Sequence, residues 1–181
     1  MFEEKITSTE RIFTGKMIKL DRLTVELMNG KQSTREVVRH PGAVGVIALT
    51  DDARIVLVKQ YRVTLERETL EIPAGKLDPG EGALECARRE LAEETGVIAH
   101  NMKFLMSMAT SIGFADEMMH FYMATDLEFH EANPDEDEFI AVELMPVEDL
   151  INLVLDGRVE DGKTVVAGLL CDAFSHRLGV Q

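Results

Sequence analysis

Residues 75–97 read GKLDPGEGALECARRELAEETGV, and the rest of the chain is best understood from this segment. From about Gly82 onward it has no proline, and no β-branched residue occurs before Thr95, which favours a helix. Gly96 follows at the position where the left-handed residue that ends many helices is expected. The sequence therefore predicts a helix over residues 82–95 that ends at a glycine C-cap.

Three glutamates gather on one side of this predicted helix. Glu90 and Glu94 are one turn apart, and Glu93 lies one step around the cylinder. Like charges at this spacing repel one another unless a cation lies over them. Carboxylate oxygens suit Mg²⁺ or Mn²⁺, which keep water and substrate phosphates in their remaining coordination positions. The pattern indicates a possible metal site, although an isolated glutamate pair would more often be a solvated face.

An apolar stripe adjoins the glutamates. Leu84, Ala87 and Leu91 are spaced to share one side of the helix, which we expect to pack on a core. Cys86 lies inside the helix and is expected to be a small buried residue rather than a nucleophile. Cys171 is the only other cysteine, so the sequence indicates neither a disulfide framework nor a cysteine zinc site.

Composition bounds the class of protein. The 181 residues are 45% hydrophobic, which fits one domain of ordinary size or a domain with a small appendage. No apolar run reaches the length of a membrane span, and the first residues lack the features of a signal peptide, so we expect a cytoplasmic protein. With 19 basic and 33 acidic residues the formal charge is −14, which disfavours nucleic-acid binding. A small phosphorylated substrate remains possible if a metal ion bridges the charges.

The first 40 residues are predicted to form a separate small β unit. Residues 23–27 alternate apolar and polar side chains, as a half-buried strand does. Asn29-Gly30 is a strong hairpin-turn signal, and residues 33–38 can return as the partner strand. About three strands of this size bury little on their own, so the unit should lean on the remainder or on another subunit. We place the boundary at residues 40–42, which read His-Pro-Gly.

The remaining residues predict strands broken by a few helices. Residues 43–49 and 55–58 are near-continuous apolar runs, typical of strands buried on both faces. Further strands are expected near residues 103–108, 120–125 and 139–144, and helices over 147–156 and 161–178. The inward side of the last helix is expected to carry Val165, Val166, Leu169, Leu170, Ala173 and Phe174. This pattern predicts a mixed sheet with helices on both sides.

The segment quoted first resembles the Nudix box, Gly-x5-Glu-x7-Arg-Glu-U-x-Glu-Glu-x-Gly-U, in which U is apolar. Every defined position is filled, by Gly75, Glu81, Arg89, Glu90, Leu91, Glu93, Glu94, Gly96 and Val97. A solvated acidic face would explain a pair of glutamates, but it would not explain the other residues at these fixed offsets.

Stretches outside the box resemble bacterial ADP-ribose pyrophosphatases. The matching segments are Asn29-Gly30-Lys31, Arg35-Glu36, His40-Pro41-Gly42-Ala43, Gln60-Tyr61-Arg62, Glu71-Ile72-Pro73-Ala74-Gly75, Gly113-Phe114-Ala115-Asp116-Glu117 and Asp135-Glu136-Asp137-Glu138. One departure is visible: the loop that usually reads Ser-Pro-Gly is Ser111-Ile112-Gly113 here, which leaves its backbone less preset. The Nudix box supports hydrolysis of a nucleoside diphosphate linked to some group, and the flanking stretches point to ADP-ribose.

The resemblance implies an α+β protein. Its fold would be a Nudix-type α/β/α sandwich with a mixed sheet over residues 41–181, preceded by a small N-terminal antiparallel β domain over residues 1–40. It further implies a homodimer that hydrolyses the pyrophosphate bond of ADP-ribose to AMP and ribose 5-phosphate. The implied cofactor is Mg²⁺ or Mn²⁺, with two or more ions per site, and neither nucleic acid nor membrane is an implied partner.

The resemblance also implies residue roles. The metal ligands would be Glu90, Glu94, Glu138 and the backbone oxygen of Ala74. Glu136 would be the general base, Glu93 would lie nearby, and Arg89 with Glu81 would brace the metal-binding carboxylates. The phosphates and terminal ribose would contact Arg62, Ser111, Gly113 and Glu117, and the adenine of the partner subunit's site would contact Arg35 and Glu36. For these last six residues, surface ion pairs or loop geometry are an alternative. Judged from the sequence alone, an acidic run such as residues 133–138 is usually a solvated loop.

Two other functions stay open at this point. The first is hydrolysis of another nucleotide sugar, a dinucleoside or an oxidised nucleotide. The second is a non-catalytic ligand sensor with the same fold. The presence of Arg89, Glu90, Glu93 and Glu94 together argues against the sensor.

Overall fold

The structure, a computed structural model, describes residues 2–133 and 139–178, with side chains up to Phe174. The elements in chain order are β1 (Lys5–Thr14), β2 (Lys19–Glu26), β3 (Gln32–Arg39), β4 (Ala43–Ala48), β5 (Arg54–Arg62), β6 (Arg67–Glu71), β7 (Ala74–Lys76), α1 (Ala83–Thr95), β8 (Val97–Ala109), β9 (Met118–Phe129), β10 (Ile140–Pro146), α2 (Val147–Leu155) and α3 (Gly162–Leu178). Every strand and helix predicted above is present, with boundaries that differ by a few residues.

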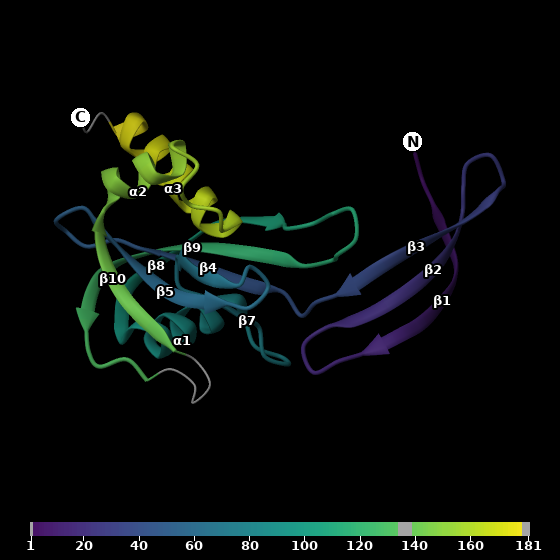
Figure 1. The fold of residues 1–181 in the computed structure, drawn as a ribbon, viewed down its shortest axis with the longest axis horizontal. Coiled ribbons are helices and arrows are strands. Elements are labelled where there is room, and N and C mark those ends of the chain that lie inside the picture. Colours follow the sequence, from purple (N-terminus) through teal and green to yellow (C-terminus); the bar gives the residue numbers. More distant parts are fainter. Residues whose placement is uncertain (1, 134–138, 179–181) are drawn as a thin grey trace.

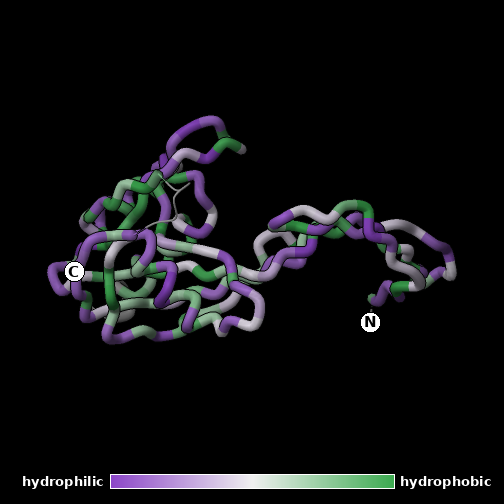
Figure 2. Tube along the Cα trace, turned by 90° about the horizontal axis from the view of Figure 1, so that it is seen from below, coloured by the Kyte–Doolittle hydropathy of each residue, from purple (hydrophilic) through white to green (hydrophobic). Residues whose placement is uncertain are grey.

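The N-terminal strands form an antiparallel sheet of their own, in the order β1-β2-β3. This sheet extends to one side of the remaining chain in both views (Figures 1 and 2). The predicted turn is formed at Gly30, whose φ is 75° and whose N–H donates to the Leu27 carbonyl at 2.8 Å. Leu23 and Val25 are buried, whereas all of β1 is exposed, so this sheet has one well-packed stripe and a large solvated surface.

Two further sheets are formed by the rest of the described chain. One is antiparallel with the order β10-β5-β6, and the other is mixed with the order β7-β4-β9-β8, in which β4 and β9 are parallel. Helix α1 lies on one side of these sheets, and α2 and α3 lie on the other (Figure 1). This arrangement is the helix-covered mixed sheet that the sequence predicts.

Residues of β4 show how the two layers share the core. Ile47 packs in the cluster that includes Leu150 of α2 and Ala167 of α3. Its neighbour Val46 packs in the second cluster, with Leu91 of α1. Since adjacent side chains of a strand point to opposite faces, β4 is buried on both sides, as its unbroken apolar run predicts.

Helix α1 agrees with its prediction in position but not in every buried residue. Gly82 is the N-cap, and Gly96 has φ 69° with its N–H donating to the Ala92 carbonyl at 2.8 Å. Cys86, Ala87 and Leu91 are buried, as expected. Leu84 is 42% exposed, so its assignment to the packed face was wrong. The side of α1 that faces the sheet carries the small residues Cys86 and Ala87, which lets the helix backbone lie closer to the sheet.

The predicted inward side of α3 was also wrong in part. Leu169 is 47% exposed and Ala173 is exposed, whereas Thr164, Ala167 and Cys171 are buried. A Cβ at Gly168 would lie 2.9 Å from Cγ2 of Val154, so α2 and α3 are in close contact at this glycine. Close helix packing selects small residues over large ones, which is why the bulkiest stripe is not the buried one. Within the described residues no helix is long and apolar enough to cross a membrane.

Candidate active site

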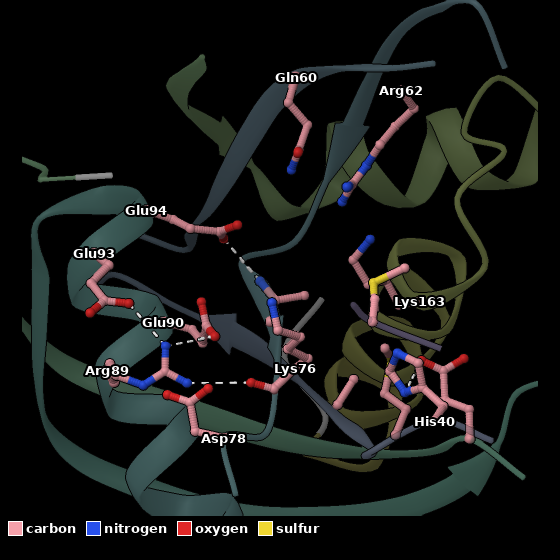
Figure 3. A pocket seen from close by; sticks show the side chains of 16 residues that line it. His40, Gln60, Arg62, Lys76, Asp78, Arg89, Glu90, Glu93, Glu94 and Lys163 are labelled. Carbon is pink, nitrogen blue, oxygen red and sulfur yellow. Dashed lines mark hydrogen bonds and ion pairs between the residues drawn. The ribbon is translucent and has the colours of Figure 1, made fainter. Parts of the chain in front are cut away.

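A cavity of about 500 Å³ lies between β5, β7, α1 and the start of α3 (Figure 3). Three groups of residues line it: carboxylates of α1, cationic side chains of β5 and α3, and residues near the N-terminal sheet. The lining includes Met17, His40, Gln60, Arg62, Ala74, Gly75, Lys76, Asp78, Arg89, Glu90, Glu93, Glu94, Glu117 and Lys163. Segments far apart in the sequence therefore meet at this cavity.

The carboxylate wall is formed by Glu90, Glu93 and Glu94, which all project from α1 toward the cavity (Figure 3). Glu94 is buried, and one of its oxygens accepts a hydrogen bond from the backbone N–H of Ala74 at 3.0 Å. This bond joins α1 to the start of β7. The predicted stripe of carboxylates therefore lines a cavity.

Arg89 is the cation that this concentration of negative charge requires. Its Nε and Nη2 each donate to one oxygen of Glu81 at 2.8 Å. Its Nη1 donates to Glu90 at 2.8 Å and to Glu93 at 3.0 Å. These bonds raise the pKa of Arg89, chiefly through Glu81, and Arg89 in turn lowers the pKa of Glu81 to about 2. Arg89 thus orients two cavity carboxylates and offsets their mutual repulsion, as the predicted brace would.

The donor set fits a hard divalent cation. Glu90, Glu93 and Glu94 offer carboxylate oxygens at one cavity wall, beside the Ala74 backbone. Within residues 2–133 and 139–178, however, no three acidic, histidine or cysteine side chains are already grouped as a metal cage. Oxygens of Glu90 and Glu94 are engaged by Arg89 and by the Ala74 N–H. This is compatible with Mg²⁺, which takes one or two carboxylates and completes its shell with water and phosphate oxygens.

A cationic group lies across the cavity from the carboxylates (Figure 3). Arg62 of β5 donates from Nε and Nη2 to the two oxygens of Glu71, at 2.7 Å each. The Lys163 ammonium pairs with the same Glu71 and, at 3.0 Å, with Asp161. Burial raises the pKa of Glu71, but hydrogen bonds from Arg62, Lys163 and Thr69 outweigh that effect and lower the pKa to about 2. Glu71 is therefore a buried, ionised carboxylate that holds two cations.

The third group joins the cavity to the N-terminal sheet. The Glu117 carboxylate lies 3.3 Å from Nδ1 of His40 and accepts from the Thr110 hydroxyl at 2.7 Å. Next to it, Arg39 donates to Asp116 and to Asp21, at 2.9 Å in both cases. These bonds fasten the end of β3 and strand β2 to the loop between β8 and β9. Glu117 was predicted from the sequence, whereas His40 had been placed at a domain boundary and in a matching segment without being given a role.

Seven of the predicted site residues come together at this cavity. They are Arg62, Ala74, Arg89, Glu90, Glu93, Glu94 and Glu117. Sequence reasoning missed Lys163 entirely and did not assign a role to Glu71. Lys163 is 92 residues from Glu71 in the chain, and nothing in the local pattern around it signals the contact. Only a prediction of how α3 docks could have found it.

Four predicted substrate residues do not line the cavity of their own chain, as far as the described residues define it. The Ser111 carbonyl accepts from the N–H groups of Phe114 and Ala115, at 3.0 and 2.9 Å, which forms a tight turn. Gly113 follows in this turn, and a Cβ there would meet no atom within 4 Å. Arg35 donates to Glu4 at 3.0 Å on the N-terminal sheet, and Glu36 beside it is exposed.

Two predicted residues, the base Glu136 and the metal ligand Glu138, lie outside the described residues. Their roles stay predictions.

Comparison with known proteins gives one matching family and several similar proteins. The NUDIX domain family matches residues 39–167. A protein named ADP-ribose pyrophosphatase from Bacillus subtilis is 48% identical over 167 residues, which are 91% of this chain and 90% of that protein. A protein named methanol dehydrogenase activator from Bacillus methanolicus is 49% identical and covers 92% of this chain and 91% of its own. A crystal structure of an ADP compounds hydrolase superposes with a TM-score of 0.85 at 25% identity, covering 98% of this chain and 96% of that one.

Proposed function

Because this chain belongs to the Nudix family, we propose that it hydrolyses the pyrophosphate bond of ADP-ribose, giving AMP and ribose 5-phosphate. The observation that carries this proposal is the cavity wall of Glu90, Glu93 and Glu94, braced by Arg89 and facing the cations Arg62 and Lys163. A diphosphate fits between two such walls because cations can contact it directly and carboxylates can contact it through divalent ions. Relatives named ADP-ribose pyrophosphatase at 48% and 37% identity favour this substrate.

The chain's own residues would divide the work of the reaction. Glu90, Glu94, the Ala74 carbonyl and Glu138 would hold two or more ions, with Mg²⁺ or Mn²⁺ as the fitting choice. When bound, such ions neutralise phosphate charge and lower the pKa of water. Glu136 would accept a proton from the attacking water, while Glu93 and Arg89 keep the site ordered. Arg62, Ser111, Gly113 and Glu117 would contact the phosphates and the terminal ribose.

The N-terminal sheet would serve a second purpose, in a homodimer. Residues 1–40 would form the dimerisation domain, and residues 41–181 would form the hydrolase domain. Arg35 and Glu36 lie on the extended sheet, outside the cavity lining of their own chain in the described residues. They would therefore contact the adenine bound by the partner subunit. We place the protein in the cytoplasm. Cys86 and Cys171 both lie in the described part of the chain and form no disulfide there, which is compatible with that reducing compartment.

A substrate panel tests this function. The purified chain is incubated with Mg²⁺ or Mn²⁺ and with ADP-ribose, a second nucleotide sugar, a dinucleoside polyphosphate or an oxidised nucleotide, and products are identified by mass. We expect ADP-ribose to give AMP and ribose 5-phosphate with the highest kcat/KM, and a chelator to stop the reaction. Preference for another substrate would assign a different Nudix activity, and tight ADP-ribose binding without turnover would indicate a sensor.

The relative named methanol dehydrogenase activator suggests a second candidate function, stimulation of a dehydrogenase. The two functions separate in one assay. Methanol oxidation by a methanol dehydrogenase is measured with the wild-type chain, with a Glu94→Gln variant and without addition. Stimulation by the wild-type chain would assign this activity, and its loss in the variant would show that it depends on hydrolysis.

A further inference from the structure

Two cations from distant parts of the chain meet at one buried carboxylate beside the active-site cavity. Arg62 and Lys163 both bind Oε2 of Glu71, and both line the cavity (Figure 3). The Glu71 side chain is 2% exposed, that of Lys163 10%, and that of Arg62 42%. Glu71 therefore lies behind the two cations, and the cations separate it from the cavity.

A contribution to stability does not by itself account for the cluster of Arg62, Glu71 and Lys163. Removing ions from water has a large cost, and an ion cluster inside a protein stabilises it no better than packed apolar residues do. Helix α3 already has an uncharged attachment to the sheet, because the buried Thr164 hydroxyl accepts from the N–H of Ile72 at 2.8 Å. The position of the cations at the cavity points to a role there.

The charges of the cavity indicate what that role is. Glu90, Glu93 and Glu94 repel a diphosphate unless cations intervene, whereas Arg62 and Lys163 can contact its oxygens directly. Among the described residues Lys163 donates to Glu71, and its ammonium also lies 3.0 Å from Asp161. An ammonium has three N–H donors, so at least one remains for an oxygen in the cavity. Arg62 uses Nε and Nη2 for Glu71, and its Nη1 makes no hydrogen bond among the described residues that would prevent it from contacting a phosphate in the cavity that it lines.

We propose that Lys163 binds a phosphate group of the substrate beside Arg62, and that Glu71 is the positioning residue that holds both cations at this wall. The inference rests on the proposed function, because it requires a substrate with a diphosphate. It extends the site to α3, so that docking of the C-terminal helix completes the phosphate-binding surface. Glu71 itself does not contact the substrate.

Replacement of Lys163 tests this role. A phosphate contact made equally in the bound substrate and in the transition state affects KM more than kcat. We expect Lys163→Met to raise KM for ADP-ribose about tenfold or more while kcat changes by less than about threefold. KM should also depend less steeply on salt concentration in the variant, because one ionic contact is lost. Lys163→Gln keeps a donor for Glu71 and replaces the methionine variant if that variant does not fold.

Two matched controls separate binding from stability. Lys59→Met removes the same charge from β5, where the exposed Lys59 pairs with the half-buried Glu143 at 3.6 Å outside the cavity lining of the described chain. Thr164→Val removes the attachment of α3 to Ile72. We expect Lys59→Met to leave KM and its salt dependence unchanged, and Thr164→Val to lower Tm without raising KM. A rise in KM that Thr164→Val reproduces would overturn the proposal, as would an unchanged KM in both Lys163 variants.

A direct titration keeps this inference separate from the proposed function. Inorganic pyrophosphate is titrated into the wild type and the Lys163 variants by calorimetry with Mg²⁺ present. If the wild type does not hydrolyse ADP-ribose, the proposed function fails, and the titration still decides the role of Lys163. Weaker pyrophosphate binding in the variants supports the phosphate contact. Equal affinities, or no binding by the wild type, would overturn it.

Discussion

The carboxylate of Glu90 lies directly against the Cα of Gly75. A Cβ built on Gly75 would lie 1.9 Å from Cδ of Glu90 and 2.0 Å from its Oε1, far inside van der Waals contact. The requirement for glycine at this position is therefore one of space. The contact joins the middle of β7 to the cavity side of α1, and Arg89 donates to Oε1 of the same carboxylate at 2.8 Å.

Gly75→Ala should therefore displace Glu90 without unfolding the protein. The clash involves the end of a flexible side chain, which can rotate away, so we expect a Tm within a few degrees of wild type. We expect kcat to fall about 10²-fold because a proposed metal ligand has moved. Gly162→Ala is the matched control, since a Cβ there meets no atom within 4 Å. Full activity of Gly75→Ala would show that the position of Glu90 is unimportant for turnover.

Glu94→Gln should remove a proposed metal ligand while keeping the fold. The amide oxygen can still accept the hydrogen bond that Glu94 accepts from the Ala74 N–H. We expect kcat to fall by about 10²–10³ with the thermal unfolding curve little changed. Glu85→Gln is the control and should retain activity, because Glu85 lies on the same helix but its carboxylate accepts from the N–H of Gly82, at the start of that helix. Normal turnover in a folded Glu94→Gln protein would exclude this site.

The two glutamates of the acidic run should differ in their response to metal. If Glu136 is the base, Glu136→Gln should lose kcat by about 10²-fold or more while the metal concentration for half-maximal rate stays the same. If Glu138 holds metal, Glu138→Gln should regain part of its activity when Mg²⁺ or Mn²⁺ is raised. Metal titrations of both variants check this. The opposite pattern would mean that the two roles are exchanged.

Glu71 should make the stability of the protein depend on pH in the acid range. Its pKa is lowered from the ordinary 4.5 to about 2, so the unfolded chain takes up the proton before the folded one does. The stabilisation is fully present above pH 4.5 and is lost as pH falls through about 2. The effect is measured from the denaturant midpoints of unfolding of the wild type and of Glu71→Gln between pH 2 and pH 4.5. We expect the difference between the two midpoints to become smaller toward low pH. A difference that does not change with pH would contradict the lowered pKa of Glu71.

Mixed dimers test whether Arg35 and Glu36 serve the partner's site. An Arg35→Ala/Glu36→Ala chain is mixed with a Glu94→Gln chain, each nearly inactive on ADP-ribose alone. If sites are shared, one site of each mixed dimer has both defects and the other has neither. Activity should then recover toward half of wild type per mixed dimer. Demonstrated subunit exchange without recovery would mean that each chain builds its own site, and that the bonds of Arg35 to Glu4 and Ser33 are its whole role.

Short-range features of this fold were predictable from the residues alone. The limits of α1, its end at Gly96, the turn at Gly30 and the burial of β4 on both faces all follow from local backbone preference and side-chain periodicity. The stripe of carboxylates on α1 was predictable for the same reason, because Glu90, Glu93 and Glu94 lie within about one helical turn of one another. The role of Arg89 as their brace was implied by the family resemblance. The free energies that favour these turns and helix ends are set by residues that are neighbours in the sequence.

Contacts between distant segments were decided by the tertiary structure. The burial of Ala167 in place of Leu169 depends on how closely α2 approaches α3 at Gly168. The meeting of Arg62, Glu71 and Lys163 depends on where the whole of α3 docks, and the pairing of His40 with Glu117 depends on the loop beside β3. In each case the free energy comes from packing that excludes water over many residues at once, so no single stretch of sequence carries the information.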